Sequence, residues 1–189
     1  MKNLLTILVT IFTISLGMAQ SETIFSNVRI SGFGGPIFSA SSLNDEIVLN
    51  AGGGGGVIVD NFFIGGFGEG LNLSGTTIKD SRYSLDLGYG GLWLGYSIQG
   101  QKAVHPFVGL KLASGEVSLS GLDDNSFEAD NIQVVQPEAG LEFNFTSWMR
   151  LVAHVGYRNV VGVNNAGVLD DVQLNGMSGG ITLRFGFFY

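Results

Sequence analysis

The sequence predicts an all-β protein: an eight-stranded, antiparallel, up-and-down transmembrane β-barrel that follows a cleaved signal peptide. Apolar and polar residues alternate with a period of two, the breaks between alternating segments are short and long in turn, and glycine accounts for 30 of the 189 residues. With no cysteine and a net charge of −7, the chain is neither a disulfide-stapled domain, a cysteine-ligated zinc domain nor a basic nucleic-acid binder.

The first segment has the layout of a secretory signal peptide. Lys2 precedes an apolar run from Leu4 to Leu16, and the small residues Gly17 and Ala19 follow it. We therefore expect cleavage after Ala19, which leaves one barrel domain over residues 20–189. An N-terminal membrane anchor is the alternative, but its apolar core would be shorter than the roughly 20 residues that span a bilayer.

Turns placed at polar, Gly-rich or Pro-bearing breaks divide the remaining chain into eight predicted strands. The connections at 60–61 and 146–148 are short and that at 98–103 is moderate, whereas the others are polar and mostly longer. Short turns at one end and long loops at the other are typical of a membrane barrel, and each segment exceeds the 9–11 residues that cross a bilayer. The predicted strands cover residues 28–40, 47–59, 62–73, 83–97, 104–119, 132–145, 149–161 and 176–189.

The first three predicted strands are rich in glycine. The run from Gly52 to Gly56 lies within a strand pattern, where glycine permits the sharp curvature of a narrow barrel. A phosphate-binding loop is the alternative, but no GxGxxG or GxxxxGK[ST] pattern occurs. In the third strand, two alternating sets, Phe62 with Ile64 and Phe63 with Phe67, compete for the outward face.

The next two predicted strands place apolar residues outward. Leu85 and Leu87 alternate with Asp86, which predicts that Asp86 points inward. In the segment 104–119, Leu110 and Leu112 flank Lys111 in the same way.

The last three predicted strands alternate most regularly. Glu138 and Glu142 share the polar face of the segment 132–145, and Arg150, His154 and Arg158 share that of 149–161. In the final segment the polar face carries Arg184, and the opposite face consists of Ile181, Leu183, Phe185, Phe187 and Tyr189.

Periodicity alone does not decide which face is inside, so a secreted lipocalin-like barrel with an apolar interior remains an alternative. Two observations favour a polar lumen within a membrane. The polar faces carry many charges of both signs, and the aromatic residues gather at the short-turn ends, as an interfacial girdle requires. These aromatic residues are Phe62, Phe63, Tyr96, Phe107, Phe143, Phe145, Trp148, Phe187 and Tyr189.

The chain resembles the small eight-stranded outer-membrane β-barrels of Gram-negative bacteria, which include OmpX and the OmpA transmembrane domain. The resemblance rests on GFGGPIFS (32–39), GGGGGVIVDNFFIGG (52–66), GLEFNFTSWMRL...GYRNVVGV (140–163) and the C-terminal ITLRFGFFY. It implies an outer-membrane location, contact with lipid and lipopolysaccharide, and a monomer. It also implies an insertion signal for the outer-membrane assembly machinery at Phe185, Phe187 and Tyr189.

The inward charges are predicted to pair and to fill the lumen. Such a plug is structural, and the alternative is a small passive pore or transporter for ions or small solutes. The turn at 146–148 brings Glu138 and Glu142 to the side of Arg150 and His154, within cross-strand or diagonal reach. The predicted lumen charge network consists of Asp86, Lys111, Glu138, Glu142, Arg150, His154, Arg158 and Arg184.

The sequence predicts neither catalysis nor a cofactor. Some eight-stranded barrels modify lipid A, but His154 is expected at mid-strand and His105 at the membrane interface by the short turns, so no base lies where that chemistry occurs. Two isolated histidines without cysteine form no transition-metal site.

Acidic residues are expected to concentrate in the long loops. Asp123, Asp124, Glu128 and Asp130 form the densest group. We expect either a solvated acidic rim or a site for a divalent cation or a partner surface, whose identity the sequence does not give. The predicted role is therefore structural or surface-interacting.

Overall fold

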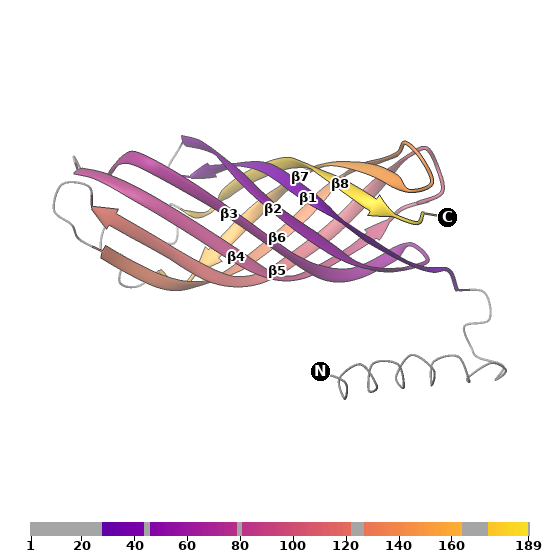
Figure 1. Ribbon diagram of the computed structural model, residues 1–189, viewed down its shortest axis with the longest axis horizontal. Helices are drawn as coiled ribbons and strands as arrows, with labels where there is room; N and C mark the ends of the chain where they lie inside the picture. The colour runs from indigo at the N-terminus through magenta and orange to yellow at the C-terminus, as the bar shows by residue number, and fades with distance from the viewer. Residues whose placement is uncertain (1–27, 44–45, 79–80, 122–126, 164–173, 189) are drawn as a thin grey trace, which may run out of the picture.

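Eight antiparallel strands close into a barrel in the computed structural model, which describes residues 28–43, 46–78, 81–121, 127–163 and 174–188 (Figure 1). Each strand pairs with the next, and β8 pairs with β1. The predicted barrel is confirmed, whereas the predicted signal peptide lies outside the described residues. The strands are β1 Ile30–Leu43, β2 Glu46–Val59, β3 Phe62–Ile78, β4 Ser81–Ser97, β5 Val104–Gly121, β6 Phe127–Asn144, β7 Met149–Val161 and β8 Gly176–Gly186.

The strands are strongly staggered around the barrel. A path across successive paired residues starts at Ser31 in β1 and returns to β1 at Ser41, ten residues further along the strand. This stagger tilts the strands and sets the bore of the tube, which in an eight-stranded barrel is just wide enough for side chains. The path is Ser31, Ile58, Phe63, Gly95, Gly109, Glu138, Gly156, Ser178 and Ser41.

The three short connections lie at one end of the barrel, together with the C-terminal end of β8 (Figure 1). In the tightest of them, Asp60 adopts a left-handed backbone with a φ of 56°, a conformation that Asp tolerates. Its side chain accepts a hydrogen bond of 3.1 Å from the backbone N–H of Arg29. The predicted long connections at the other end are wrong for two of the four, because β1 and β2 are separated by residues 44–45 alone and β3 and β4 by residues 79–80 alone.

At the opposite end, β3 to β6 extend further than the other strands (Figure 1). They contain 17 or 18 residues each, against 14 in β1 and β2, 13 in β7 and 11 in β8. The predicted strands 62–73, 83–97, 104–119 and 132–145 stop two to five residues short of these loop ends. Because 9–11 residues cross a bilayer, the additional residues form a part of the barrel wall that projects beyond the membrane.

The polarity of the wall inverts where this projecting part begins, as β5 illustrates. Lys111 is buried in the lumen and Leu112, which faces outward, is exposed. A few residues further on, Val117 is buried inside and Glu116 is exposed outside. The outer face of β5 is therefore apolar near the short turns and polar near the loop end. In β2 the outer face stays apolar, because Ile47 and Leu49, on either side of the buried Val48, are both exposed.

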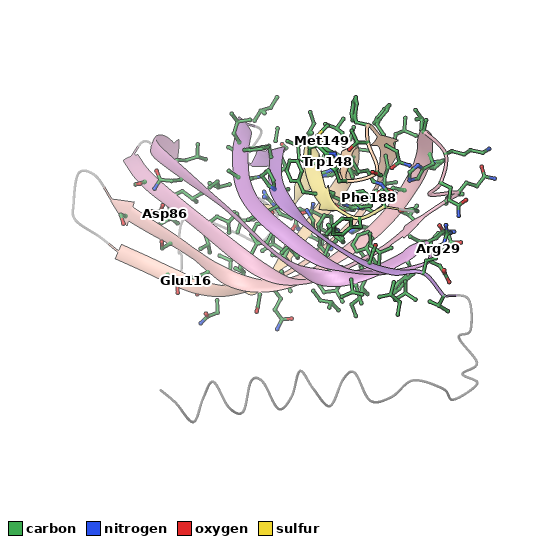
Figure 2. All side chains as sticks on the ribbon, turned by 45° about the vertical axis from the view of Figure 1, so that its right-hand side comes forward. Arg29, Asp86, Glu116, Trp148, Met149 and Phe188 are labelled. Carbon is green, nitrogen blue, oxygen red and sulfur yellow. The ribbon has the colours of Figure 1, made fainter. Side chains whose placement is uncertain are left out.

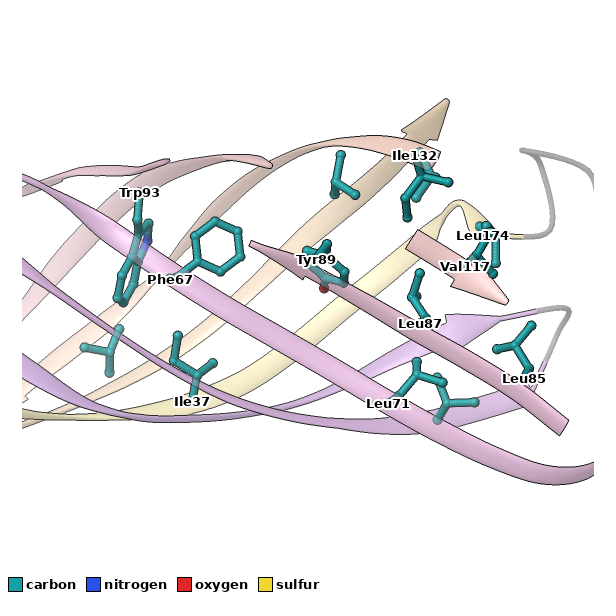
Figure 3. Close-up of a cluster of buried hydrophobic side chains, with 14 of the residues drawn as sticks. Ile37, Phe67, Leu71, Leu85, Leu87, Tyr89, Trp93, Val117, Ile132 and Leu174 are labelled. Carbon is teal, nitrogen blue, oxygen red and sulfur yellow. The ribbon is translucent and has the colours of Figure 1, made fainter. Parts of the chain in front are cut away.

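Buried apolar side chains of β2 to β7, together with Leu174, fill the interior toward the loop end of the barrel (Figure 3). We call this cluster the apolar lid, because it lies between the charged lumen and the loop end of the barrel. It consists of Val48, Leu71, Leu85, Leu87, Val117, Leu119, Ile132, Val134, Val160 and Leu174.

The inversion corrects the prediction for Asp86. Leu85 and Leu87 point into the barrel and Asp86 is exposed outside it, where it accepts a hydrogen bond from the Asn72 side chain. The prediction assigned the apolar face of this strand to lipid along its whole length. At this height the outer face meets water, so the apolar residues turn inward.

Inward glycines permit the curvature of the first three strands. A Cβ atom added at Gly52 would lie 2.0 Å from the Gly68 carbonyl oxygen, and one at Gly65 would lie 2.1 Å from that of Gly55. No real side chain fits at these distances, so the predicted reason for the glycine run is supported.

In the described residues, no helix reaches the length and hydropathy that a membrane span requires.

The position of the membrane predicts that substitution by arginine has unequal effects at two sites in β5. Val108 is exposed on the apolar outer face near the short turns, which we call the apolar band, and Glu116 is exposed on the outer face nearer the loop end. We expect Val108→Arg to lower the free energy of unfolding by about 2–4 kcal/mol and Glu116→Arg to change it by at most about 1 kcal/mol. Urea titration in lipid vesicles measures both, and equal losses would contradict this position of the membrane.

Candidate functional site

The candidate site is the charged lumen below the apolar lid. Of the predicted lumen residues, all but Asp86 lie inside the barrel and are buried: Lys111, Glu138, Glu142, Arg150, His154, Arg158 and Arg184. The lumen also holds two acidic residues and one histidine that the prediction did not place there. Glu69 and Asp130 are buried inside, and His105, which was expected at the interface, is buried and faces the lumen.

Glu142 in β6 is the centre of the network near the short-turn end. Its carboxylate accepts hydrogen bonds from Ser97 Oγ at 2.6 Å and from Arg150 at 3.0 Å, and it also binds Arg184. The Nε2 atom of His105 lies 2.7 Å from Glu142 Oε2. Four strands thus contribute one side chain each to a single carboxylate of β6.

The guanidinium group of Arg184 lies inside a cage of four aromatic rings. Its Cζ atom is 4.4 to 5.0 Å from their centroids, which is within cation–π distance. The rings are those of Phe33, Phe63, Trp93 and Phe107. The predicted place of Phe63 and Phe107 in the outer girdle is wrong, because both point inward and are buried.

Two inward glycines leave room for the cage. A Cβ atom at Gly95 would lie 2.2 Å from Phe63, and one at Gly109 would lie 2.6 Å from Phe107. The rings therefore occupy the width that side chains at these positions would otherwise take. The cage, with Arg184 in it, fills this cross-section of the lumen.

Lys111 is the centre of a second network, between the cage and the apolar lid. Its ammonium group binds Glu69 and lies 3.5 Å from Glu138 Oε2. Each carboxylate has a further partner: Ser39 Oγ donates to Glu69 at 3.0 Å, and Trp93 Nε1 donates to Glu138 at 2.7 Å.

His154 lies beside the second network. Its Nε2 atom is 3.9 Å from Glu138 Oε2, which is too far for a hydrogen bond, and the residue is buried. His154 and His105 thus face carboxylates inside the tube.

Phe188 covers the lumen at the short-turn end. Its ring lies over the Arg150 guanidinium group at 4.3 Å, and its backbone N–H donates to the Ser147 carbonyl at 2.8 Å. Figure 2 shows Phe188 at the end of the barrel that also carries Arg29, opposite Asp86 and Glu116. Of the predicted insertion signal, Phe185 and Phe187 are exposed, and Tyr189 lies outside the described residues.

Most of the predicted loop cation site lies outside the described residues, and only the position of Asp130 can be compared with the prediction. Asp123 and Asp124 lie outside the described residues, and Glu128 lies within β6, where only the backbone is described. Asp130 is a strand residue buried at the level of the apolar lid, not a loop residue. Across the described ranges, no three His, Asp or Glu side chains are arranged to hold a metal ion.

A pattern in the sequence could have identified Glu69. Phe63, Phe67 and Glu69 are separated by even numbers of residues and therefore share a face, so choosing that pair of phenylalanines for the lumen also brings Glu69 inside. The same reasoning applies to His105, because it lies an even number of residues before Lys111, which the sequence already placed in the lumen.

Comparison with solved structures supports the fold. Neisserial surface protein A is similar over 87% of this chain and 100% of its own, with a TM-score of 0.57 and 11% sequence identity. Ail is the attachment invasion locus protein of Yersinia pestis, and its structure was solved in complex with the heparin analogue sucrose octasulfate. It is similar over 84% of this chain and 96% of its own, with a TM-score of 0.52 and 16% sequence identity. No family model and no curated protein sequence matches. The resemblance to small eight-stranded outer-membrane barrels is thus confirmed for the fold.

The Glu142 network predicts non-additive effects of substitution. We expect Glu142→Gln to lower the free energy of unfolding by about 3–5 kcal/mol, because it leaves two buried arginines without their carboxylate. Arg150→Gln should cost less, since Arg184 still pairs with Glu142. The double variant should lose less than the sum of the two single losses. Strictly additive losses in urea titrations would show that the two side chains do not interact.

Proposed function

We propose that the protein is a non-catalytic outer-membrane barrel that contacts partners at the cell surface and does not conduct solutes. The filled lumen is the observation that carries this proposal. The apolar band contacts outer-membrane lipid and lipopolysaccharide, the barrel is a monomer, and the assembly machinery reads its C-terminal aromatic residues.

The arrangement of the lumen supports a closed tube. A permeating ion would have to displace Arg184 from its four rings, separate Lys111 from its carboxylates and then enter the apolar lid. The last step alone is costly, because an ion in an apolar environment loses its hydration. A passive pore is therefore the weaker alternative.

The projecting part of β3 to β6 supports a surface role. The β2–β3 pairing ends at Ala51 and Gly70, and the β6–β7 pairing ends at Gln133 and Val161, although β3 and β6 continue beyond these residues. The resulting four-stranded sheet stands above the closed barrel with two lateral edges. Such a sheet offers side chains and backbone groups to another polypeptide.

The charge of this end favours a basic partner. Asp86 and Glu116 are exposed on the outside of the described projecting part, and Asp123 and Asp124 are close to its end in sequence. Ail, which has the same fold, was crystallised with a polyanion, but a polyanion would be repelled by these carboxylates. We therefore propose a positively charged protein surface as the partner of this end.

The test is binding to charged surfaces by the mature protein refolded in lipid nanodiscs. We expect it to bind a polylysine-coated sensor more strongly than a heparin-coated one, with binding that weakens as salt rises. A variant with four neutralised carboxylates should bind polylysine at least tenfold more weakly. It carries Asp86→Asn, Glu116→Gln, Asp123→Asn and Asp124→Asn.

A matched control changes a carboxylate at the other end. Asp60→Asn, in the short turn between β2 and β3, should leave polylysine binding nearly unchanged. Binding to heparin instead, or an equal loss in the Asp60→Asn variant, would overturn the proposed partner chemistry.

A further inference from the structure

A hollow of about 450 Å³ lies on the outer wall where the barrel closes, across the neighbouring strands β8, β1 and β2 (Figure 1). Small residues form its floor: Gly179 in β8 pairs with Ala40 in β1, and Ala51 lies on the same outer face of β2. Larger apolar side chains stand around this floor and are exposed. They are those of Phe38, Leu49 and Ile181.

The glycine in the floor is not required by the packing of the barrel. A Cβ atom added at Gly179 would lie 3.6 Å from the His154 carbonyl oxygen and 3.7 Å from Val155 Cγ1, which are ordinary van der Waals distances. The inward glycines that permit curvature differ, because a Cβ atom there would collide with the backbone of the next strand. The hollow is therefore not a by-product of strand curvature.

The hollow is continuous with the surface that contacts lipid. Phe38 and Ile181 lie on its short-turn side, toward the apolar band, and Ile47 and Met177 are exposed on its loop-end side. Among the described residues, none that lines it is charged. An empty hollow in a wall surrounded by hydrocarbon would forfeit the dispersion contacts of its lining, so a hydrocarbon chain is the occupant that fits.

The hollow lies nearer the loop end than the short-turn end. Leu49, one of its walls, is close to Glu46, where β2 begins at the loop end. In the proposed outer-membrane orientation the loops are extracellular, so the occupant belongs to the outer leaflet. The inference below rests on this part of the proposed function.

We infer that the hollow binds one acyl chain of a lipopolysaccharide molecule. A chain elsewhere in the bilayer is equally apolar, so the gain comes from packing: a chain in the hollow contacts the wall on several sides. Lipopolysaccharide carries more acyl chains on one head group than a phospholipid does. While one chain lies in the hollow, the others cover the exposed Ile47 and Met177 beside it, and the linked contacts reinforce one another.

The position of the hollow across the first and last strands gives this chain an effect on stability. Pairing between β1 and β8 is interrupted between the pairs Gly34–Phe185 and Ile37–Thr182. Pro36 lies in this interval and has no N–H group to donate. A chain that contacts both strands beside the interruption should therefore stabilise the closed barrel.

The first test is native mass spectrometry of the refolded mature protein titrated with lipopolysaccharide. The native protein should retain one molecule, and Gly179→Leu, which fills the hollow, should weaken this binding at least tenfold. Leu49→Ala, which removes one wall, should also weaken it. Gly66→Leu is the matched control, because Gly66 faces outward in β3, away from the hollow, and a Cβ atom there would lie 3.6 Å from the nearest backbone oxygen.

Three outcomes would overturn the inference. They are equal binding by the native protein and Gly179→Leu, an equal loss in Gly66→Leu, and equally tight binding of phosphatidylethanolamine, which would assign the hollow to a phospholipid.

Heat unfolding in vesicles, followed by gel migration, gives a second measurement. Addition of lipopolysaccharide to phosphatidylethanolamine and phosphatidylglycerol vesicles should raise the unfolding midpoint of the native protein by about 3 °C or more. The midpoint of Gly179→Leu should not respond, and each variant is compared with itself, so a change in its own stability does not matter. An equal rise in both would contradict the site. Neither test involves the projecting end, so failure of the proposed basic partner and failure of this site are distinguishable.

Discussion

In the part of the barrel that lies in the membrane, the carboxylate of Glu142 neutralises two buried arginines and links their strands to β6. An apolar bilayer forces charged side chains away from the outer face, and a tube of eight strands leaves them little water inside. Arg150 and Arg184 are therefore stable in the lumen only if a carboxylate meets them there, and Glu142 meets both. Since these contacts connect β6, β7 and β8, the pairing also secures the strands that complete the barrel.

The inversion of wall polarity follows from the same constraint. On the short-turn side of the level where the projecting part begins, lipid contacts the outer face, which is therefore apolar, and the paired charges occupy the interior. Above it, water surrounds the wall, and the apolar lid becomes the interior instead. The protein is thus a membrane barrel continuous with an open, water-exposed sheet of β3 to β6, and the lid closes the lumen where the two meet.

Strict alternation made much of this structure predictable. The outward and inward faces of β7 and β8 follow directly from their sequence, and so does the inward position of Arg150, Arg158 and Arg184. Alternation separates two faces but does not state the solvent that each one meets. Asp86 was misplaced for this reason, because its strand leaves the lipid.

The aromatic cage escaped prediction for a related reason. Phe63 and Phe107 stand near the short turns, where an aromatic residue suits either the lipid interface or the lumen. The choice depends on the inward glycines of the adjacent strands, Gly95 and Gly109, which leave the space that the rings fill. Strand register decides which residues face one another across the lumen, and no local pattern encodes it.

The central claim is that paired charges and the apolar lid close the lumen. Planar-bilayer conductance of the refolded mature chain tests it most directly, after heat-modifiable gel migration has shown that the barrel is folded. The account predicts no current above that of the bare bilayer. Stable stepwise currents from the folded barrel would contradict it and identify the protein as a channel.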